Sequence, residues 1–335
     1  MSDLLGVSGI MSGIGGMNNW KRDSDVNGAA ANEAADRVAQ DIRRIARKLL
    51  SDGEVDVFIG YGQGTLPSRV TPVFITRPED ADALIWDARC ENDLVVYLPG
   101  IEGKAGVVVK GCDGRALARL LAEKQVERDR LKIVAVECAG VIDRKSVKRD
   151  GGNRVHLHPS CQVCEERTAP VYDFLAGGAT GPVVPGGPGD KSGSRDPFGE
   201  IREFEARASE ERWNYFSQEF DRCILCYACR QACPLCYCPE CFADRATPKW
   251  IGKDRALSDK MVFHLGRAIH LAGRCIDCGA CVRACPMGID LRKLTRKMEK
   301  DARELFGYEA GKAAAAGALP LFASFTREDP DDFIL

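Results

Sequence analysis

The chain has 335 residues, of which 16 are cysteine, and its 47 basic and 49 acidic side chains give a formal net charge of −2. A chain of this length can bury ordinary cores without disulfide staples, so we expect a reducing, cytoplasmic setting in which clustered cysteines bind metal or do redox chemistry. The balanced charge gives no sign of a nucleic-acid partner. No apolar run approaches the about 20 residues of a membrane helix, so no transmembrane segment is expected.

The first half of the chain has alternating helix and strand patterns. Residues 1–31 are rich in Gly and Asn and predict a flexible N-terminal segment. Residues 32–175 begin with an amphipathic helix, a second helix is expected to be capped by Asp113, and the apolar runs VDVFIGY, PVFIT, LVVYLP, AGVVVKG and KIVAVE are typical of strands. Near-continuous apolar strands between helices predict an α/β N-terminal domain with a mostly parallel sheet.

Four cysteines of this region suggest a metal centre. Cys112 follows the run AGVVVKG and Cys138 ends KIVAVEC, with one crossover helix between them. The two strands should therefore be parallel neighbours whose carboxyl ends meet at one edge of the sheet, where α/β proteins place their sites. Cys161 and Cys164 form a CxxC in the following loop. We expect these four thiols to bind a third cluster, with [4Fe-4S] favoured over zinc; the alternative is buried, inert thiols.

The strongest motif lies after a Gly/Pro-rich linker at residues 176–197. The spacing C-x2-C-x2-C-x3-C-P occurs at residues 223–234 and again at residues 275–286. This is the bacterial ferredoxin signature, in which the fourth cysteine of each run ligates the other cluster. Two [4Fe-4S] clusters are thus predicted. The first is assigned to Cys223, Cys226, Cys229 and Cys285, and the second to Cys275, Cys278, Cys281 and Cys233.

Helical patterns surround both motifs. Trp213, Phe216 and Phe220 precede the first motif at helical spacing, and a stripe at Val262, Leu265, Ala268 and Ile269 lies between the motifs. Residues 198–308 are therefore predicted to form a C-terminal, mainly helical two-cluster ferredoxin domain rather than a compact α/β ferredoxin. Residues 309–335 form a tail, whose apolar stretch AAAAGALPLFASF is expected to dock on another subunit.

Three further cysteines, Cys236, Cys238 and Cys241, lie close behind the first motif as C-x-C-x2-C. They predict either ligands of a further cluster, completed by Cys90 or another cysteine, or a redox-active thiol group. No Ser-His-Asp, paired-carboxylate or phosphate-loop pattern is present, so no catalytic residue is assigned.

Several of these stretches together resemble a known family. The segment VVVKGCDGRALARLLAEKQVERDRLKIVAVECAGVID, the later CQVC and the run CILCYACRQACPLCYC are similar to the iron–sulfur beta subunits of the deazaflavin-reducing hydrogenase and formate dehydrogenase family. They also resemble electron-input subunits of anaerobic sulfite reductases and subunits of heterodisulfide-reductase-like complexes. The resemblance implies an iron–sulfur electron-transfer subunit of a cytoplasmic, anaerobic oxidoreductase complex, with the other subunits as partners.

Two other functions remain open. A flavin-containing subunit, with FAD in the N-terminal domain, would reduce a soluble acceptor directly. The flavin-binding members of the family carry an SGG-type loop leading into a helix, and this sequence has no such segment. A scaffold or sensor would instead use the C-x-C-x2-C thiols to respond to oxidants.

Overall fold

The computed structural model describes residues 26–66, 68–145, 156–178, 196–252, 254–312 and 321. Most of the predicted N-terminal segment and of the linker lies outside these residues. So does the C-terminal tail beyond residue 312, except Leu321, and with it nearly all of the stretch expected to dock on another subunit. The division into domains therefore stays a prediction.

A five-stranded sheet organises the first half of the chain. Its strand order is β2 (Val70–Ile75), β1 (Val57–Gln63), β3 (Ala105–Val109), β4 (Leu131–Val136) and β5 (Phe174–Ala176). Only the β1–β2 pair is antiparallel, and the other three pairs are parallel. All residues of β3 are buried, as the continuous apolar run predicts for a central strand covered on both faces. The predicted mostly parallel sheet is confirmed.

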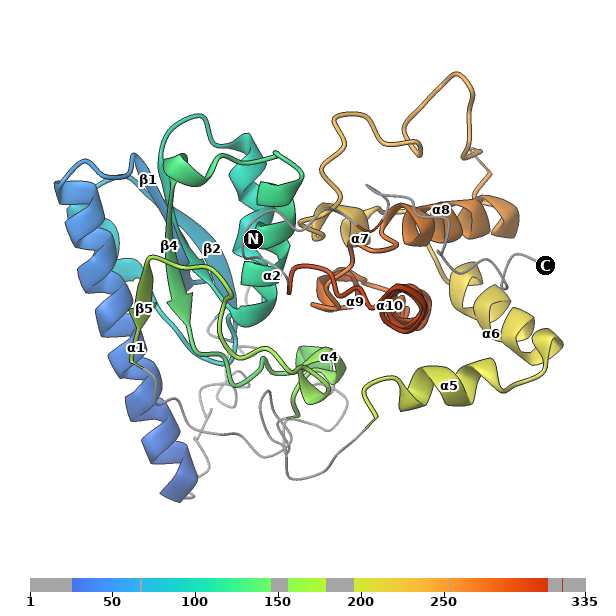
Figure 1. Cartoon of the computed structure of the whole chain (residues 1–335), viewed down its shortest axis with the longest axis horizontal. Coiled ribbons are helices and arrows are strands. Elements are labelled where there is room, and N and C mark those ends of the chain that lie inside the picture. Colours follow the sequence, from blue (N-terminus) through green and yellow to red (C-terminus); the bar gives the residue numbers. More distant parts are fainter. Residues whose placement is uncertain are drawn as a thin grey trace, which may run out of the picture.

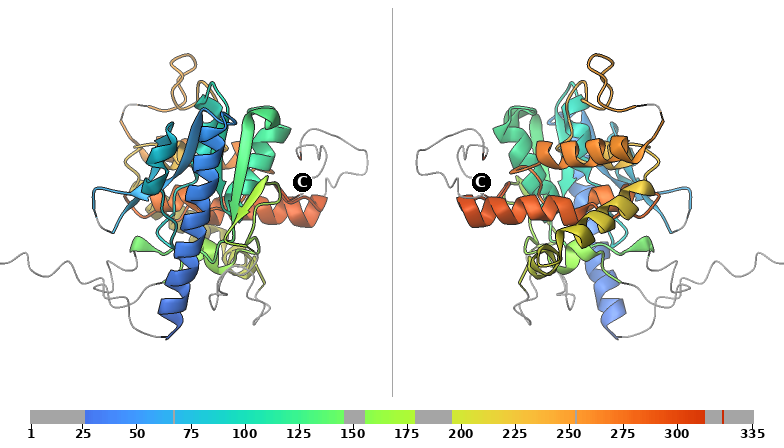
Figure 2. Two further views of the ribbon diagram at one scale, coloured as in Figure 1. Left: turned by 90° about the vertical axis from the view of Figure 1, so that its left-hand side faces the viewer. Right: turned by 90° about the vertical axis from the view of Figure 1, so that its right-hand side faces the viewer.

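Helices cover the two faces of the sheet (Figures 1 and 2). On one face lies α1 (Val26–Ser51), which buries Ile42, Ile45 and Leu49 as its amphipathic pattern predicts. On the other lies α2 (Gly111–Ala122), between the sheet and the second half of the chain. Asp113 stands in the third position of α2, not at its cap, and its carboxylate accepts a hydrogen bond from the Lys110 backbone N–H at 3.1 Å.

The run LVVYLP is not a strand. Residues Leu94–Gly100 form a 3₁₀ helix, η2, and the Asp93 side chain accepts a hydrogen bond from the Val95 backbone N–H at its start. Pro99 lacks the N–H that a ladder needs, and the apolar side chains of this run are buried by the helix instead. The short strand β5 was not predicted, because three residues give too little pattern. The remaining short helices of this half are η1 (Pro78–Ala83), η3 (Arg128–Arg130) and α4 (Pro159–Gln162).

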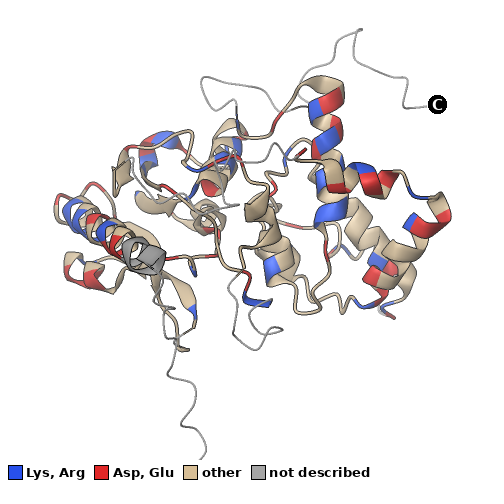
Figure 3. Cartoon of the chain, turned by 90° about the horizontal axis from the view of Figure 1, so that it is seen from below, with Lys and Arg blue, Asp and Glu red and all other residues tan. Residues whose placement is uncertain are grey.

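Every regular element that the structure describes between residues 196 and 312 is a helix, in agreement with the expected helical character. These are α5 (Gly199–Glu205), α6 (Ser209–Asp221), α7 (Ala228–Gln231), α8 (Leu257–His270), α9 (Ala280–Ala284) and α10 (Arg292–Phe306). Basic and acidic side chains are interspersed along the helices in the view of Figure 3. None of the helices in the described part of the chain is long and apolar enough to cross a membrane.

Four apolar side chains expected to face the helical core are exposed: Val262, Leu265 and Ile269 of the α8 stripe, and Trp213 on α6. Of that stripe, only Ala268 is buried. The buried face of α8 instead carries Phe263 and His264, and the His264 ring stacks on Phe220 with the ring centroids 4.4 Å apart. The predicted stripe on α8 has helical spacing. However, α8 packs against α6 through the neighbouring face, which carries the larger aromatic rings.

The two halves of the chain are joined by shared packing and by ion pairs. Leu271 and Ile276 pack into the same apolar core as the sheet. At the C-terminal end of α2, the Glu123 carboxylate accepts hydrogen bonds from Arg274 at 3.0 and 2.8 Å. This joint holds α2, and with it Cys112, against the cysteine motifs.

Candidate metal centres

The two ferredoxin-type loops have the same backbone shape. In the first, Leu225 and Tyr227 have φ angles of 51° and 59°; at the equivalent positions of the second, Asp277 and Gly279 have φ angles of 52° and 70°. A short helix, α7 or α9, follows each loop. Residues other than glycine rarely adopt positive φ, and such strain persists only where the surroundings require it. The repeated shape therefore belongs to the motif and not to the individual side chains.

Backbone amides in these loops point at the cysteine sulfurs. The Leu225 N–H donates to Cys223 Sγ at 3.3 Å. At the same position of the second loop, the Asp277 N–H donates to the Cys275 sulfur. Such bonds stabilise the thiolate form that a metal needs. The loop geometry thus fits a cluster whose sulfur atoms carry negative charge.

The second set of thiols surrounds one cavity. Cys233, Cys275, Cys278 and Cys281 line a space of about 20 Å³, and they are the four residues that the spacing assigned to the second cluster. Burial raises the pKa of Cys275, Cys278 and Cys281 above the ordinary value of a thiol. These side chains are neutral unless iron displaces their protons, since cluster binding requires thiolates. A four-thiol donor set in a dry cavity fits a [4Fe-4S] cluster.

The first set lies nearer the surface. Cys229 and Cys285 are buried in one apolar cluster with Phe220 and Phe263, and Cys223 packs against it. Cys223 interacts electrostatically with both Cys285 and Cys226, which indicates that the four assigned thiols are neighbours. Cys226 is exposed. This set therefore gives the protein a surface-accessible end.

The N-terminal cysteines meet at the sheet edge, as the topology predicted. Strands β3 and β4 are parallel neighbours, with Val107 paired to Ile133, so that Cys112 and Cys138 follow adjacent strand ends. Cys112, Cys161 and Cys164 line one cavity of about 60 Å³. Burial, together with the neighbouring Cys161 thiol, raises the pKa of Cys138 to about 11.

Backbone amides also reach the sulfurs of this third set. Gly140 N–H donates to Cys138 Sγ and Val141 N–H donates to Cys161 Sγ, each at 3.4 Å. The same kind of contact occurs in the ferredoxin-type loops. Three of the four thiols line one cavity and Cys138 lies beside Cys161, so a cluster at this third set stays a prediction.

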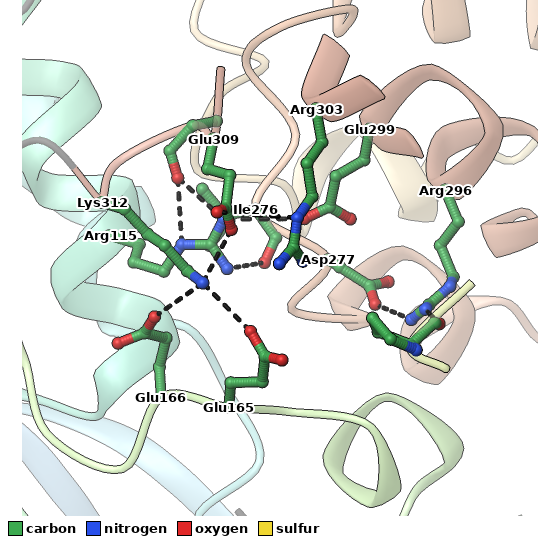
Figure 4. A network of polar contacts seen from close by, with 12 residues as sticks. Arg115, Glu165, Glu166, Ile276, Asp277, Arg296, Glu299, Arg303, Glu309 and Lys312 are labelled. Atoms are coloured by element: carbon green, nitrogen blue, oxygen red, sulfur yellow. Dashed lines mark hydrogen bonds and ion pairs between the residues drawn. The ribbon is translucent and has the colours of Figure 1, made fainter. Parts of the chain in front are cut away.

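Paired charges wall this cavity (Figure 4). Arg115 donates to the Ala310 carbonyl at 2.9 and 2.8 Å and pairs with Glu299 at 3.6 Å. Lys312 pairs with Glu165 at 3.1 Å and with Glu166 at 3.4 Å, beside the CxxC loop. These acidic and basic side chains form ion pairs with one another. The wall of the cavity beside the thiols therefore consists of paired charges.

None of the C-x-C-x2-C cysteines lines either of the two cavities described above. A hydrogen bond from Cys233 lowers the pKa of Cys236, which also contacts Arg267. Cys241 accepts a hydrogen bond from Arg230, and Cys238 is exposed. Cys90 is buried and its sulfur accepts the Asp87 N–H at 3.4 Å. A further cluster or a thiol group at these residues stays a prediction.

A site for a single metal ion needs a different arrangement of ligands from a cluster site. Among the described residues, no group of three or more Cys, His, Asp or Glu side chains is arranged to hold one metal ion. Zinc ligands all lie about 2.3 Å from one atom, whereas a cubane distributes its four thiolates over four irons at separate corners. Eight cysteines in a duplicated C-x2-C-x2-C-x3-C-P spacing are typical of cubanes rather than of single zinc ions.

Several residues at these sites could not be found from the sequence. Ser160 and Gly279 join the CxxC loop to the second motif, and Arg267 lies between the two ferredoxin-type sets. Arg283 donates to the Cys278 carbonyl at 2.6 Å and to the Glu91 carbonyl at 2.9 Å. These contacts join residues far apart in the chain, and no local pattern signals them.

Comparison with known proteins agrees with this geometry. Residues 218–289, which contain both cysteine motifs, match the 4Fe-4S dicluster domain family. The chain is an iron–sulfur protein. Over 103 residues it is 37% identical to the F420-dependent formate dehydrogenase subunit beta of Methanocaldococcus jannaschii. The aligned segment covers 31% of this chain and 26% of that subunit. That match thus spans about a quarter of the relative's length.

A second relative matches over most of its length. The F420-dependent formate dehydrogenase 1 subunit beta of Methanococcus maripaludis is 23% identical, with 81% of this iron–sulfur protein and 90% of that subunit covered. Among solved structures, a chain of the F420-reducing [NiFe] hydrogenase complex from Methanosarcina barkeri matches at 19% identity with a TM-score of 0.32, covering 41% of this chain and 63% of that one. The resemblance to the beta subunits that the sequence suggested is confirmed.

Proposed function

We propose that this protein is an electron-transfer subunit of a cytoplasmic, anaerobic oxidoreductase complex of the formate dehydrogenase or F420-reducing hydrogenase type. It would hold three [4Fe-4S] clusters, one at each of the thiol sets described above. When bound, the clusters supply one-electron carriers. The relatives' names and the dicluster match support this proposal.

The position of Cys278 carries the proposal. Cys278 lines the cavity of the second set, and it also lines the cavity that contains Cys112, Cys161 and Cys164. On the other side, Cys281 packs against the apolar cluster that holds Cys229. The thiol sets are therefore arranged in line, third to second to first. A series of neighbouring sets that ends at the exposed Cys226 supports electron transfer rather than storage.

The protein's own residues hold this line in place. Loop amides orient the sulfurs, buried apolar side chains exclude water, and the Glu123–Arg274 joint fixes the two halves relative to each other. The protein supplies position and electrostatics, while the cofactor carries the redox chemistry. No residue of this chain is assigned a catalytic role.

The test is reduction of the chain within its native complex. The tagged protein is purified anaerobically with its partners, and formate or H₂ is added while the visible absorption of the clusters is followed. We expect bleaching that requires the partner subunits and that is diminished in Cys278→Ser. Purification without any oxidoreductase partner, or without iron, would contradict the proposal. A tightly held yellow flavin released on denaturation would favour the flavin-containing alternative.

A further inference from the structure

Arg267 is a buried cation that has no carboxylate partner among the residues that the structure describes. It lies on α8, is 5% exposed, and donates through Nη2 to the Cys229 carbonyl at 3.0 Å. Its Nε has no hydrogen-bond partner in the described part of the chain. The other buried arginines of the described residues each have an acid: Arg115 pairs with Glu299, Arg119 with Glu123, and Arg292 and Arg296 with Asp277.

A cation in this position needs a negative charge nearby. Removing an ion from water costs several kcal/mol unless an opposite charge offsets it. Among the described residues, its hydrogen-bond partners are the Cys229 carbonyl and the Cys236 sulfur, and no carboxylate pairs with it. The surrounding polypeptide therefore supplies at most part of the counter-charge that this cation needs.

The surroundings of Arg267 identify the missing charge. It lines the same cavity as Cys233 and Cys281 of the second set, and its carbonyl partner Cys229 belongs to the first set. Arg267 is therefore situated between two sets of thiolates, once these carry iron.

We infer that Arg267 is the shared counter-ion of the two ferredoxin-type clusters and sets their reduction potentials. The inference rests on the proposed function in needing clusters at these cysteines. One-electron reduction adds one negative charge to a cluster and its thiolates and requires no proton; the electron comes from the donor subunit of the complex. A buried cation a few ångströms away stabilises that added charge, and salt screens it little. Loss of the cation makes both clusters harder to reduce.

The experiment is an anaerobic potentiometric titration of the full-length protein, with EPR detection of the reduced clusters and iron analysis of each sample. Arg267→Gln and Arg267→Met remove the charge, and Arg267→Lys keeps it. At a fixed poise we expect the ratio of reduced to oxidised ferredoxin-type cluster to fall about tenfold in the neutral variants, a shift of about 59 mV for a one-electron couple. Arg267→Lys should restore the potentials. Arg202→Gln, which removes an exposed cation paired with Asp196, is the control for net charge and should leave the potentials unchanged.

Each outcome decides the inference. Full iron with unchanged potentials in the neutral variants overturns it and leaves the proposed function intact. Loss of iron in the neutral variants, with full iron in Arg267→Lys, supports it, since the charge itself is then required. Loss of iron in all three variants points to a role of the Arg267 side chain in packing and overturns the inference. A wild-type protein without iron overturns the proposed function together with this inference.

Discussion

The Ser160 hydroxyl donates a hydrogen bond to the Cys278 carbonyl at 3.3 Å, across 118 positions in the sequence. The neighbouring Gly279 makes this approach possible. A Cβ at Gly279 would lie 2.6 Å from Ser160 Oγ and 2.9 Å from His158 Cε1, and the residue has φ +70°. This contact holds the CxxC loop of the third thiol set against the cysteine loop of the second thiol set.

Gly279→Ala should loosen the joint between these two thiol sets. Left-handed backbone costs alanine about 1–2 kcal/mol, and the clash with Ser160 adds to that cost. Gly288→Ala is a matched control, because Gly288 has φ +66° with no atom within 4 Å of a Cβ built there. We expect a larger fall in unfolding temperature, and a larger loss of iron, for Gly279→Ala. Equal effects would show that the close packing contributes nothing.

His158 should make stability fall in mild acid. Burial, together with the nearby cations Arg283, Arg292 and Lys145, lowers the pKa of His158 to about 3. The unfolded side chain titrates at about 6.5, so between these pH values the unfolded state binds the extra proton and stability is lost as the pH falls. Above about pH 6.5 this contribution is constant.

The measurement is the unfolding temperature of the anaerobic protein at several pH values from about 8 to about 5. His158→Gln keeps an acceptor for the Ser160 N–H and should flatten the acid side of the profile. His270→Gln, at an exposed position, is the control. An unchanged acid slope in His158→Gln would exclude this residue as its source.

Glu123→Gln should weaken the joint between the two halves of the chain. The Glu123 carboxylate accepts from Arg119, Arg274 and the Tyr237 hydroxyl, and its side chain is 10% exposed. The change leaves largely buried cations without their acid, at a cost of about 2–4 kcal/mol. Asp82→Asn, which removes an exposed pair with Arg47, should cost less than about 1 kcal/mol. Denaturant unfolding compares them, and equal costs would contradict the assigned role.

Sequence spacing is most informative where the chain itself fixes the distance. Three cysteines on one tight loop have few possible arrangements, so the grouping of Cys275, Cys278 and Cys281 could be predicted. The placement of Cys112 and Cys138 after adjacent strand ends could be predicted from one crossover between parallel strands.

Features set by tertiary packing could not be predicted. The apolar run at Leu94–Gly100 is a 3₁₀ helix because the Asp93 cap and Pro99 outweigh its strand-like composition. On α8 the predicted stripe is largely exposed, and the buried face carries His264, which stacks on Phe220 of α6. The role of Arg267 depends on the absence of a nearby acid, which no sequence pattern reveals.

Replacing Cys236, Cys238 and Cys241 together by serine should separate the two predictions for these residues. If they ligate a further cluster, the iron content should fall by about four per chain. If they form a redox-active thiol group, iron should stay unchanged while thiol titration detects three fewer reactive groups. Unchanged iron content and unchanged thiol reactivity would exclude both cluster ligation and a redox-active thiol group at these residues.

The most direct test of the account is the iron and acid-labile sulfide content of the anaerobically purified full-length protein, with Cys112→Ser measured beside it. Three cubanes predict about twelve irons per chain, and Cys112→Ser should lower this to about eight while the two ferredoxin-type EPR signals persist. A wild-type protein with about eight irons, and no change in Cys112→Ser, would contradict the third cluster. It would also contradict the proposed series of three clusters with Cys278 between the third and second thiol sets.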